Sequence, residues 1–120
     1  GILISLGIWL KSKRYSFDRE LKKCESPIEE QMLRALYAQG FKPYTQLKVG
    51  AYRLDIGLYY KGKKIAVECD GKAFHTRPDQ QERDERRDRY LQTQRWLVLR
   101  FTGSDIYRDI DGCVEKIKSI

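Results

Sequence analysis

The sequence has too few cysteines, spaced too widely, to build a cross-linked or zinc-bound domain. Its three cysteines, Cys24, Cys69 and Cys113, are odd in number and lie far apart in the chain. This pattern excludes a disulfide framework and a paired zinc-ligand spacing. We therefore expect a reducing compartment, in which the cysteines serve as small buried apolar residues.

The sequence also lacks an apolar run long enough to cross a bilayer. Residues 1–10 are largely apolar, whereas a spanning helix needs about 20 such residues. Basic residues follow at Lys11, Lys13 and Arg14. We favour a helix packed on the domain or on a partner over the end of a spanning helix with a cytoplasmic basic flank. No small-residue cleavage site follows, which argues against a signal peptide. Without an initiator methionine, we expect a segment of a longer protein.

What the chain does contain is enough apolar sequence for one globular domain. It has 120 residues, 41% of them hydrophobic and 12% aromatic, which allows a real core. The net charge of +7 favours a polyanionic partner, although charge alone does not separate nucleic acid from an anionic membrane. We assign residues 1–23 to an N-terminal segment or linker and residues 24–120 to the domain.

Two short strands joined by a tight turn organise this domain. Residues 53–58 and 65–71 alternate apolar and polar side chains with the period of a strand. The dipeptide Lys61-Gly62 supplies the glycine that a two-residue hairpin turn needs. Closing the hairpin there puts Asp55 directly opposite Glu68. A slip by one residue would set apolar residues against carboxylates, so the pattern selects this register.

The same register gives each strand one apolar face. Leu54, Ile56 and Leu58 are expected on the same face of the first strand, with Leu54 opposite Cys69.

The predicted pairing of two carboxylates is unfavourable unless something positive lies near them. Asp55 and Glu68 repel each other across the hairpin, and Asp70 lies diagonally beside them. One interpretation is a divalent cation with oxygen ligands. The other is that Arg53, which faces Asp70 in this register, neutralises the cluster together with nearby lysines. The pairing alone leaves both interpretations open.

A helix precedes the hairpin. Ser26 is a good N-cap, Pro27 suits the first helical position and Glu29 is expected to complete a capping box. Gly40 is expected to end the helix. The predicted buried stripe consists of Ile28, Met32, Ala35, Leu36 and Tyr37.

The remaining elements complete an α/β pattern. We predict a strand at 44–49, a highly charged helix at 79–94 whose charges mostly form a solvated face, and a strand at 96–101 that is apolar on both faces and hence interior. Ser104 is expected to cap a last helix. Its predicted stripe is Ile106, Ile110, Cys113, Val114 and Ile117.

The order α-β-β-β-α-β-α predicts a three-layer sandwich. A central, mixed four-stranded sheet would be covered by helices on both faces, with the charged helix returning the fourth strand to the sheet as a neighbour.

The ordered motifs of residues 24–120 resemble one family of nuclease domains. They are Ser26-Pro27-Ile28-Glu29, Tyr52-Arg53-Leu54-Asp55, Val67-Glu68-Cys69-Asp70-Gly71, His75, Arg83-Asp84, Arg87-Asp88 and Trp96-Leu97-Val98-Leu99-Arg100-Phe101-Thr102-Gly103. The set is similar to the PD-(D/E)xK superfamily, on the branch related to the very-short-patch repair endonucleases. The resemblance implies the restriction-endonuclease-like fold, with the order of elements given above.

By this resemblance, Asp55 and Glu68 would bind Mg²⁺, or Mn²⁺ in its place, with the backbone carbonyl of Cys69 as a third ligand. Mg²⁺ in proteins is often held by one or two carboxylates plus substrate phosphate. The ion would polarise the scissile phosphodiester and activate a water. Glu29 would project toward this site, although its capping role is a sufficient alternative, and Gln46 would line the same face.

The sequence departs from the superfamily pattern at one position. The lysine that ends the motif is replaced by Asp70, with Lys72 nearby in the following loop. The related branch carries an acid and a glycine here, as Asp70-Gly71 does. The general base is left unassigned. The single histidine, His75, suits proton transfer, and a structural role is the alternative.

These observations predict a metal-dependent DNA endonuclease, the nuclease module of a larger DNA-processing protein. The alternatives are a non-catalytic nucleic-acid-binding module that keeps the fold, and an interaction domain tethered to a membrane. We expect a cytoplasmic, nucleoid-associated protein, with membrane anchoring as the minor alternative. Phosphate contacts without sequence readout are expected from Gln46, Lys48, Lys72, Arg77, Arg83 and Arg87.

Overall fold

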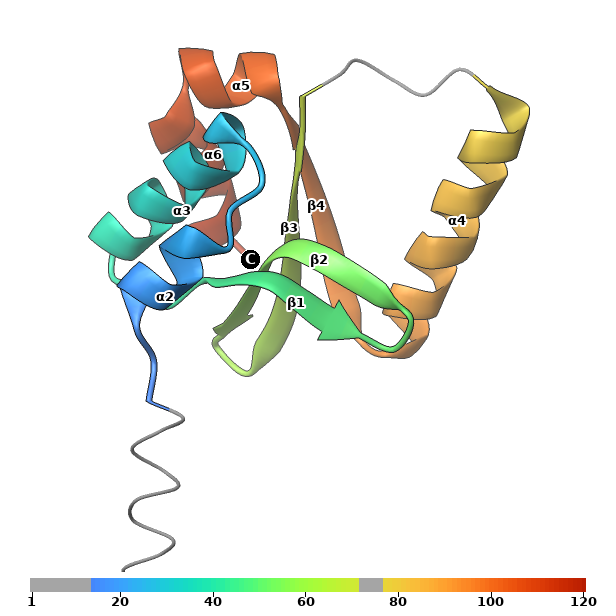
Figure 1. Cartoon of the computed structure of the whole chain (residues 1–120), viewed down its shortest axis with the longest axis horizontal. Helices are drawn as coiled ribbons and strands as arrows, with labels where there is room; N and C mark the ends of the chain where they lie inside the picture. Colours follow the sequence, from blue (N-terminus) through green and yellow to red (C-terminus); the bar gives the residue numbers. More distant parts are fainter. Residues whose placement is uncertain (1–13, 72–76) are drawn as a thin grey trace, which may run out of the picture.

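The computed structural model describes residues 14–71 and 77–120 and contains a mixed four-stranded sheet between helices (Figure 1). The strand order is β1-β2-β3-β4, with β1–β2 and β2–β3 antiparallel and β3–β4 parallel. This confirms the predicted fold class. The strands are β1 (Tyr44–Val49), β2 (Tyr52–Tyr60), β3 (Lys63–Asp70) and β4 (Trp96–Thr102).

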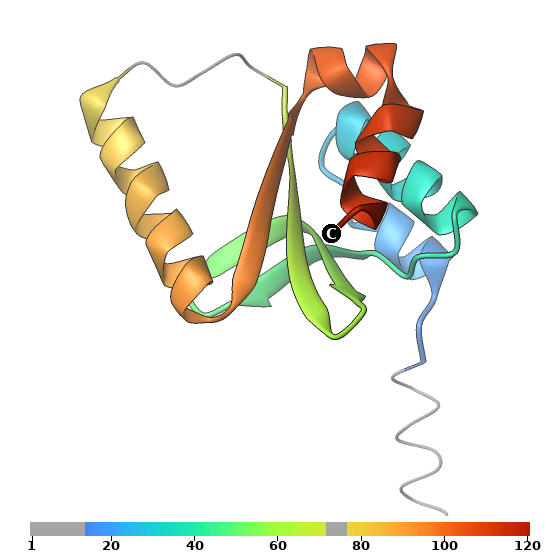
Figure 2. The ribbon, with the colours of Figure 1, turned by 180° about the vertical axis from the view of Figure 1, so that it is seen from behind.

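Helices cover both faces of the sheet. On one side lie α2 (Phe17–Lys22), α3 (Pro27–Ala38), α5 (Gly103–Arg108) and α6 (Ile110–Lys118), and on the other lies α4 (Pro78–Thr93) (Figures 1 and 2). None of these helices is both long and apolar enough to cross a membrane. The predictions for residues 1–13 and for Lys72 and His75 lie outside the described residues.

Each face of the sheet has its own core. The larger core lies against α3 and α6 and includes Ile56, Leu58, Ile65 and Val67, all at most 1% exposed. The smaller core lies against α4. It contains Leu54, Ala66, Leu91 and Trp96. Residues of β3 thus alternate between the two cores as a strand requires.

The prediction that Leu54 shares a face with Ile56 is wrong: Ile56 is the last residue of β2 that pairs with β3, and Leu54, beyond it, packs in the other core. Ile56 belongs to the larger core and Leu54 to the smaller one. In β1, Gln46 has a left-handed φ of 50° and interrupts the ladder to β2. The β2–β3 ladder also ends at Ile56–Val67, so the predicted pairing of Leu54 with Cys69 does not form.

The β2–β3 turn is formed as predicted. Lys61 and Gly62 have φ values of 52° and 73°, the left-handed pair that a two-residue hairpin requires. Tyr60 pairs with Lys63, and the register follows the prediction as far as Ile56–Val67.

Helix α3 begins as predicted and buries the predicted Ile28, Met32 and Leu36, but Leu33 takes the place of Tyr37 in the buried stripe. The Ser26 hydroxyl accepts the Glu29 N–H at 3.3 Å, and Pro27 opens the helix. Leu33 is fully buried, whereas Tyr37 is 45% exposed and stacks on Phe17 of α2. The Tyr37 ring is therefore held by a helix in residues 15–24, a segment whose sequence left a linker and a helical approach as alternatives.

That additional helix, α2, is tied to the sheet by a buried carboxylate. Ser16 caps α2 by accepting the Arg19 N–H. Glu20 is 1% exposed and accepts the backbone N–H of Thr45 at 2.9 Å. Its charge is compensated by Arg19 and Lys23, each 3.2 Å away.

The C-terminal region differs from the prediction in two respects. The N-cap of α5 is Thr102 rather than Ser104, with Asp105 closing a capping box, and the helical region is divided in two at Asp109. In addition, β4 is an edge strand of the described sheet and not an interior one, because β3 is the only described strand that pairs with it. Leu97 is accordingly 44% exposed. In the stripe predicted for the last helix, Ile106, Cys113, Val114 and Ile117 are buried and Ile110 is partly buried.

Candidate functional site

The site is centred on the point where β2 and β3 separate. Beyond the Ile56–Val67 pair, hydrogen bonds from side chains take the place of the backbone hydrogen bonds between β2 and β3. The Glu68 carboxylate accepts the Asp55 N–H at 3.0 Å, and the Asp55 carboxylate accepts the Cys69 N–H, also at 3.0 Å. Each carboxylate therefore binds the backbone of the opposite strand. This reciprocal arrangement brings together the two acids that the hairpin register predicted to meet.

The proximity of these carboxylates leaves Asp55 in an unfavourable environment for a negative charge. Burial, followed by the neighbouring Glu68 charge, raises the pKa of Asp55 to about 7. The hydrogen bond from the Cys69 N–H opposes this increase, and the charge of Glu29 adds to it. Within the described residues, no lysine or arginine pairs with Asp55. A cation placed here would reverse the increase.

Glu68, in contrast, is compensated by an arginine from α4. Its side chain is 8% exposed and forms an ion pair with the Arg87 guanidinium. Arg87 also donates to the Arg53 carbonyl at 2.8 Å, so it bridges the gap between β2 and β3. Arg53, which one interpretation of the sequence assigned to this cluster together with nearby lysines, has its guanidinium 4.0 Å from Glu25.

A second pair fixes α4 against the edge strand. Arg100 of β4 makes two hydrogen bonds to Asp88, at 2.7 and 2.8 Å. These bonds raise the pKa of Arg100 further above its ordinary value. Arg100 is the register partner of Glu68 in the parallel β3–β4 pair. The bidentate pair thus holds α4 where Arg87 can reach Glu68.

Glu29 approaches the site from α3 and does not close the predicted capping box. Its carboxylate accepts the Glu25 N–H at 3.2 Å and the Gln46 side-chain N–H at 3.2 Å. Glu29 is 6% exposed, and its charge acts on Asp55. The left-handed backbone of Gln46 directs its amide to this carboxylate. The structure therefore brings Glu29 and Gln46 to the same region as Asp55.

The acids open onto a hollow of about 210 Å³ that faces α4. Its lining residues are Asp55, Glu68, Cys69, Asp70, Asp84, Arg87 and Arg100. The described residues contain no group of three or more His, Cys, Asp or Glu side chains arranged to hold a metal ion. The prediction requires two carboxylates, which Mg²⁺ commonly accepts together with waters and phosphate. The uncompensated Asp55 charge beside this hollow fits a divalent cation.

The predicted DNA-contacting residues are dispersed. Lys48 is exposed on β1, and Gln46 and Arg87 belong to the site. Arg77 and Arg83 are exposed near the beginning of α4, and both pair with Asp79.

Three polar residues of the site were not assigned a site role from the sequence. Arg100 and Asp88 form the bidentate pair, and Asp84 lines the hollow. The spacing of Asp84, Arg87 and Asp88 at i, i+3 and i+4 put them on one helix face. The missing information was which face of α4 meets the sheet.

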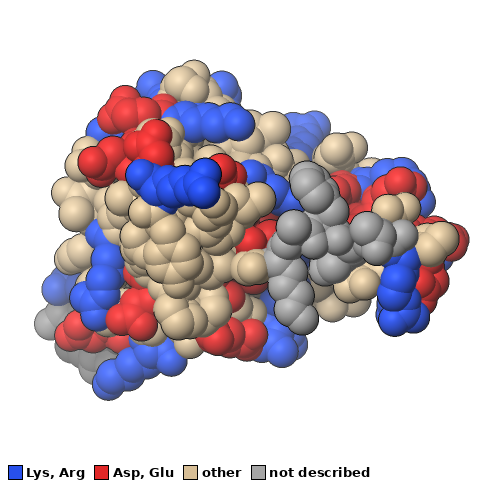
Figure 3. Space-filling view, turned by 90° about the horizontal axis from the view of Figure 1, so that it is seen from above, with Lys and Arg blue, Asp and Glu red and all other residues tan. Residues whose placement is uncertain are grey.

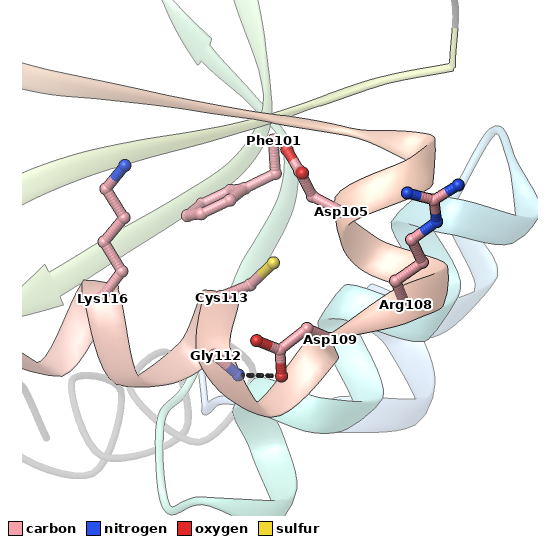
Figure 4. A pocket seen from close by; sticks show the side chains of 7 residues that line it. All are labelled: Phe101, Asp105, Arg108, Asp109, Gly112, Cys113 and Lys116. Carbon is pink, nitrogen blue, oxygen red and sulfur yellow. Dashed lines mark hydrogen bonds between the residues drawn. The ribbon is translucent and has the colours of Figure 1, made fainter.

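A second hollow, of about 280 Å³, lies between β4, α5 and α6 (Figure 4). Its two carboxylates are occupied by helix capping. Asp105 accepts the Thr102 N–H at 3.1 Å, and Asp109 accepts the Gly112 N–H at 3.0 Å. Burial raises the pKa of the Cys113 thiol, so this cysteine is not an activated nucleophile.

The Asp55 pKa predicts an unusual dependence of stability on pH. In the unfolded chain the Asp55 pKa should be near 3.8, whereas in the folded protein it is about 7. Between these values the folded state binds more protons, so the free energy of unfolding should fall as pH rises from about 4 to about 7. Urea unfolding in EDTA at several pH values measures this, with Asp55→Asn as the reference. Parallel curves for the two proteins would contradict the prediction.

Comparison with known proteins adds independent information. The family model REase_MTES_1575 matches residues 28–120, which include Glu29, Asp55 and Glu68. An uncharacterized protein of Haemophilus influenzae (strain ATCC 51907 / DSM 11121 / KW20 / Rd) is 35% identical over 78 residues, which cover 65% of this chain and 62% of the relative. The chain therefore spans less than two thirds of that relative's length.

Proposed function

We propose, because this chain belongs to the REase_MTES_1575 family of restriction endonuclease-like domains, that it is a metal-dependent DNA endonuclease that hydrolyses phosphodiester bonds. The family assignment shows a nuclease-like domain. The finer placement, in the PD-(D/E)xK superfamily near the very-short-patch repair branch, is part of the proposal. So is a role as the nuclease module of a larger DNA-processing protein.

One observation carries the proposal: Asp55 and Glu68 replace the β2–β3 ladder and bring two carboxylates together at a hollow. Such a pair is unfavourable for folding because the charges repel in a partly desolvated place. The pKa of Asp55, which is raised to about 7, reflects this unfavourable environment. A site that retains an unfavourable arrangement is a candidate for function.

The residues of the site would have distinct roles. Asp55 and Glu68 would hold Mg²⁺ or Mn²⁺, with the Cys69 carbonyl as the proposed third ligand. The ion would supply Lewis-acid stabilisation of the phosphoryl oxygens and a nucleophilic water at neutral pH. Glu29 and Gln46, which are hydrogen-bonded to each other at 3.2 Å, would orient groups at the same side of the site.

Two arginines of the site suit the charge of a phosphate group. Arg87 and Arg100 line the hollow together with the carboxylates. A phosphodiester entering the hollow would meet both cations, and Arg87 could exchange Glu68 for a phosphate oxygen. Planar guanidinium groups bind phosphate in a bidentate manner. Because Asp70 stands in place of the usual lysine, the arginines would supply the positive charge that binds the phosphate.

The alternative, a nucleic-acid-binding module without catalysis, is favoured by a different observation. Arg87 already forms an ion pair with Glu68. If this pair persists when DNA is bound, Glu68 is not available to a metal ion, and the domain would bind phosphates without cleaving them.

Plasmid cleavage distinguishes the two functions. Supercoiled plasmid and single-stranded DNA are incubated with the whole chain in Mg²⁺, Mn²⁺ or EDTA, beside Glu68→Gln purified in the same way to reveal contaminating nuclease. We expect nicked or linear products only with a divalent ion and only with the unaltered protein. Salt-sensitive binding without cleavage in either metal would contradict the nuclease function and support the binding module.

A further inference from the structure

The end of the sheet away from the carboxylates carries basic side chains that form no ion pair with an acid in the described part of the chain. It is formed by the β2–β3 turn and the beginning of β4 (Figure 2). Lys64 is paired with Tyr59 of β2 and with Trp96 of β4. Lys63 precedes Lys64 in the chain, and Arg95 precedes Trp96. Within residues 14–71 and 77–120, no carboxylate forms an ion pair with these three basic residues.

The same residues surround a hollow of about 540 Å³. Its lining consists of Gly62, Lys63, Lys64, Arg95 and Leu97. Three of these five residues are cations and none is an acid. Charge complementarity therefore favours a polyanion over a neutral or basic partner.

The outer surface of α4 is a less favourable place for an anion, although it holds more arginines. Three of them each pair with an acid one turn earlier, namely Arg83 with Asp79, Arg86 with Glu82 and Arg89 with Glu85. Viewed from above the opposite end of the sheet, acidic and basic side chains are interspersed (Figure 3). The chain as a whole has a net charge of +7. On α4 the positive charges are compensated by neighbouring acids, whereas at the β2–β3 turn no acid of the described residues pairs with them.

An exposed aromatic ring lies beside these cations. Tyr59 is 60% exposed, and its ring is supported by Tyr44 and Trp96 at centroid distances of 5.9 and 5.7 Å. Lys64 lies over the Trp96 ring at 5.3 Å. A supported ring with a free face is a platform on which an unpaired base can stack. A duplex would offer phosphates to the cations but no unpaired base to Tyr59.

We propose that this surface, defined by Tyr59, Lys63, Lys64 and Arg95, binds single-stranded nucleic acid. The phosphates contact the three cations, and one base stacks on Tyr59. Lys64 is four residues from Glu68 along β3, roughly 13 Å at the rise of a strand. The surface is therefore separate from the carboxylate site and independent of its chemistry.

The test measures binding of a labelled oligothymidylate to the whole chain in EDTA. Two triple variants remove the same number of positive charges. The first changes the proposed surface and the second changes arginines of α3 and α4 that pair with acids: Lys63→Gln/Lys64→Gln/Arg95→Gln, and Arg34→Gln/Arg86→Gln/Arg89→Gln. Circular dichroism melting checks that both fold.

We expect the first triple to weaken binding at least about tenfold and to reduce the salt slope by about 2, since each phosphate contact on a single strand contributes about 0.7. The second triple should weaken binding about threefold or less. Equal weakening by both triples, or no weakening by the first, would overturn the proposal. The proposal would also be overturned if the first triple variant lost binding to phosphatidylserine vesicles but kept binding to the oligonucleotide. That result would indicate an anionic membrane as the partner.

The aromatic contact has its own control. Tyr59→Ala should weaken binding of the single strand about fivefold or more, whereas Tyr59→Phe, which keeps the ring, should bind like the unaltered protein. Binding of a duplex should be the same in all three proteins. Unchanged single-strand binding by Tyr59→Ala would overturn the stacking contact. Because the assay contains no divalent ion, a protein that cannot cleave DNA can still pass it, so its outcome is independent of the proposed nuclease function.

Discussion

Replacing Asp55 by asparagine is expected to lower the rate of DNA cleavage on the order of 1000-fold. The asparagine side chain keeps the size of the aspartate and an oxygen that can accept the Cys69 N–H, which is bonded at 3.0 Å in the unaltered protein. It removes the charge that a divalent ion requires. A metal ion contributes several kcal/mol to stabilising a phosphoryl transition state, and about 4 kcal/mol corresponds to this factor. Initial rates of plasmid nicking with excess Mg²⁺ measure the effect.

Loss of folding would not account for this result, because Asp55→Asn should be more stable than the unaltered protein at about pH 8. Burial and Glu68 raise the pKa of Asp55, so the charged form destabilises the fold by about 2 kcal/mol after a discount for partial exposure. The matched control is Asp111→Asn, an exposed acid in the first turn of α6. Cleavage by Asp55→Asn at a rate close to that of the control would contradict the proposed role.

Replacing Arg87 by alanine is expected to lower the free energy of unfolding by about 3 kcal/mol in EDTA. The substitution leaves Glu68, which is 6% exposed, buried without its cation. Removing one partner of a buried pair typically costs about 3–5 kcal/mol. The Arg53 carbonyl also loses the hydrogen bond it accepts from Arg87. Urea unfolding followed by circular dichroism measures the change.

The metal dependence of this loss distinguishes an ion site from an ordinary ion pair. If Glu68 can bind a divalent ion, Mn²⁺ should restore more stability to Arg87→Ala than it adds to the unaltered protein. Arg86→Ala is the control, because Arg86 pairs with Glu82 on the exposed face of α4 and should cost about 0.5 kcal/mol or less. Adding Glu68→Gln to Arg87→Ala should recover stability. No recovery in that double variant would contradict the account.

The hairpin at the centre of the site could be predicted from the sequence because its signals are local. Strand alternation and the Lys61-Gly62 turn fix the register, and the register determines that Asp55 meets Glu68. The cap of α3 at Ser26 is a local signal of the same kind. In each case, residues only a few positions apart in the sequence are sufficient to determine the local structure.

The features that could not be predicted depend on how distant elements pack. Arg87 reaches Glu68 because the Arg100–Asp88 pair and the core around Leu91 place α4 against the sheet. Leu54 lies in the smaller core, beyond the point where β2 and β3 stop pairing, and not beside Ile56 as alternation predicts. Tertiary contacts override strict alternation at such points, which tend to be functional.

The apolar composition of β4 led to the prediction of an interior strand. The strand is at the edge, and Leu97 is 44% exposed beside the basic residues of the sheet end. Hydrophobicity alone does not distinguish an interior strand from an edge strand with a helix on one face. The order of strands in the sheet was the missing information.

The central claim is that Asp55 and Glu68 together hold one divalent ion. Titration with Mn²⁺ at about pH 8, where Asp55 has lost its proton, tests this directly when free Mn²⁺ is followed by electron paramagnetic resonance. The unaltered protein should bind an ion that the Asp55→Asn/Glu68→Gln variant does not bind. Equal binding by the two proteins, or no binding by either, would contradict the claim.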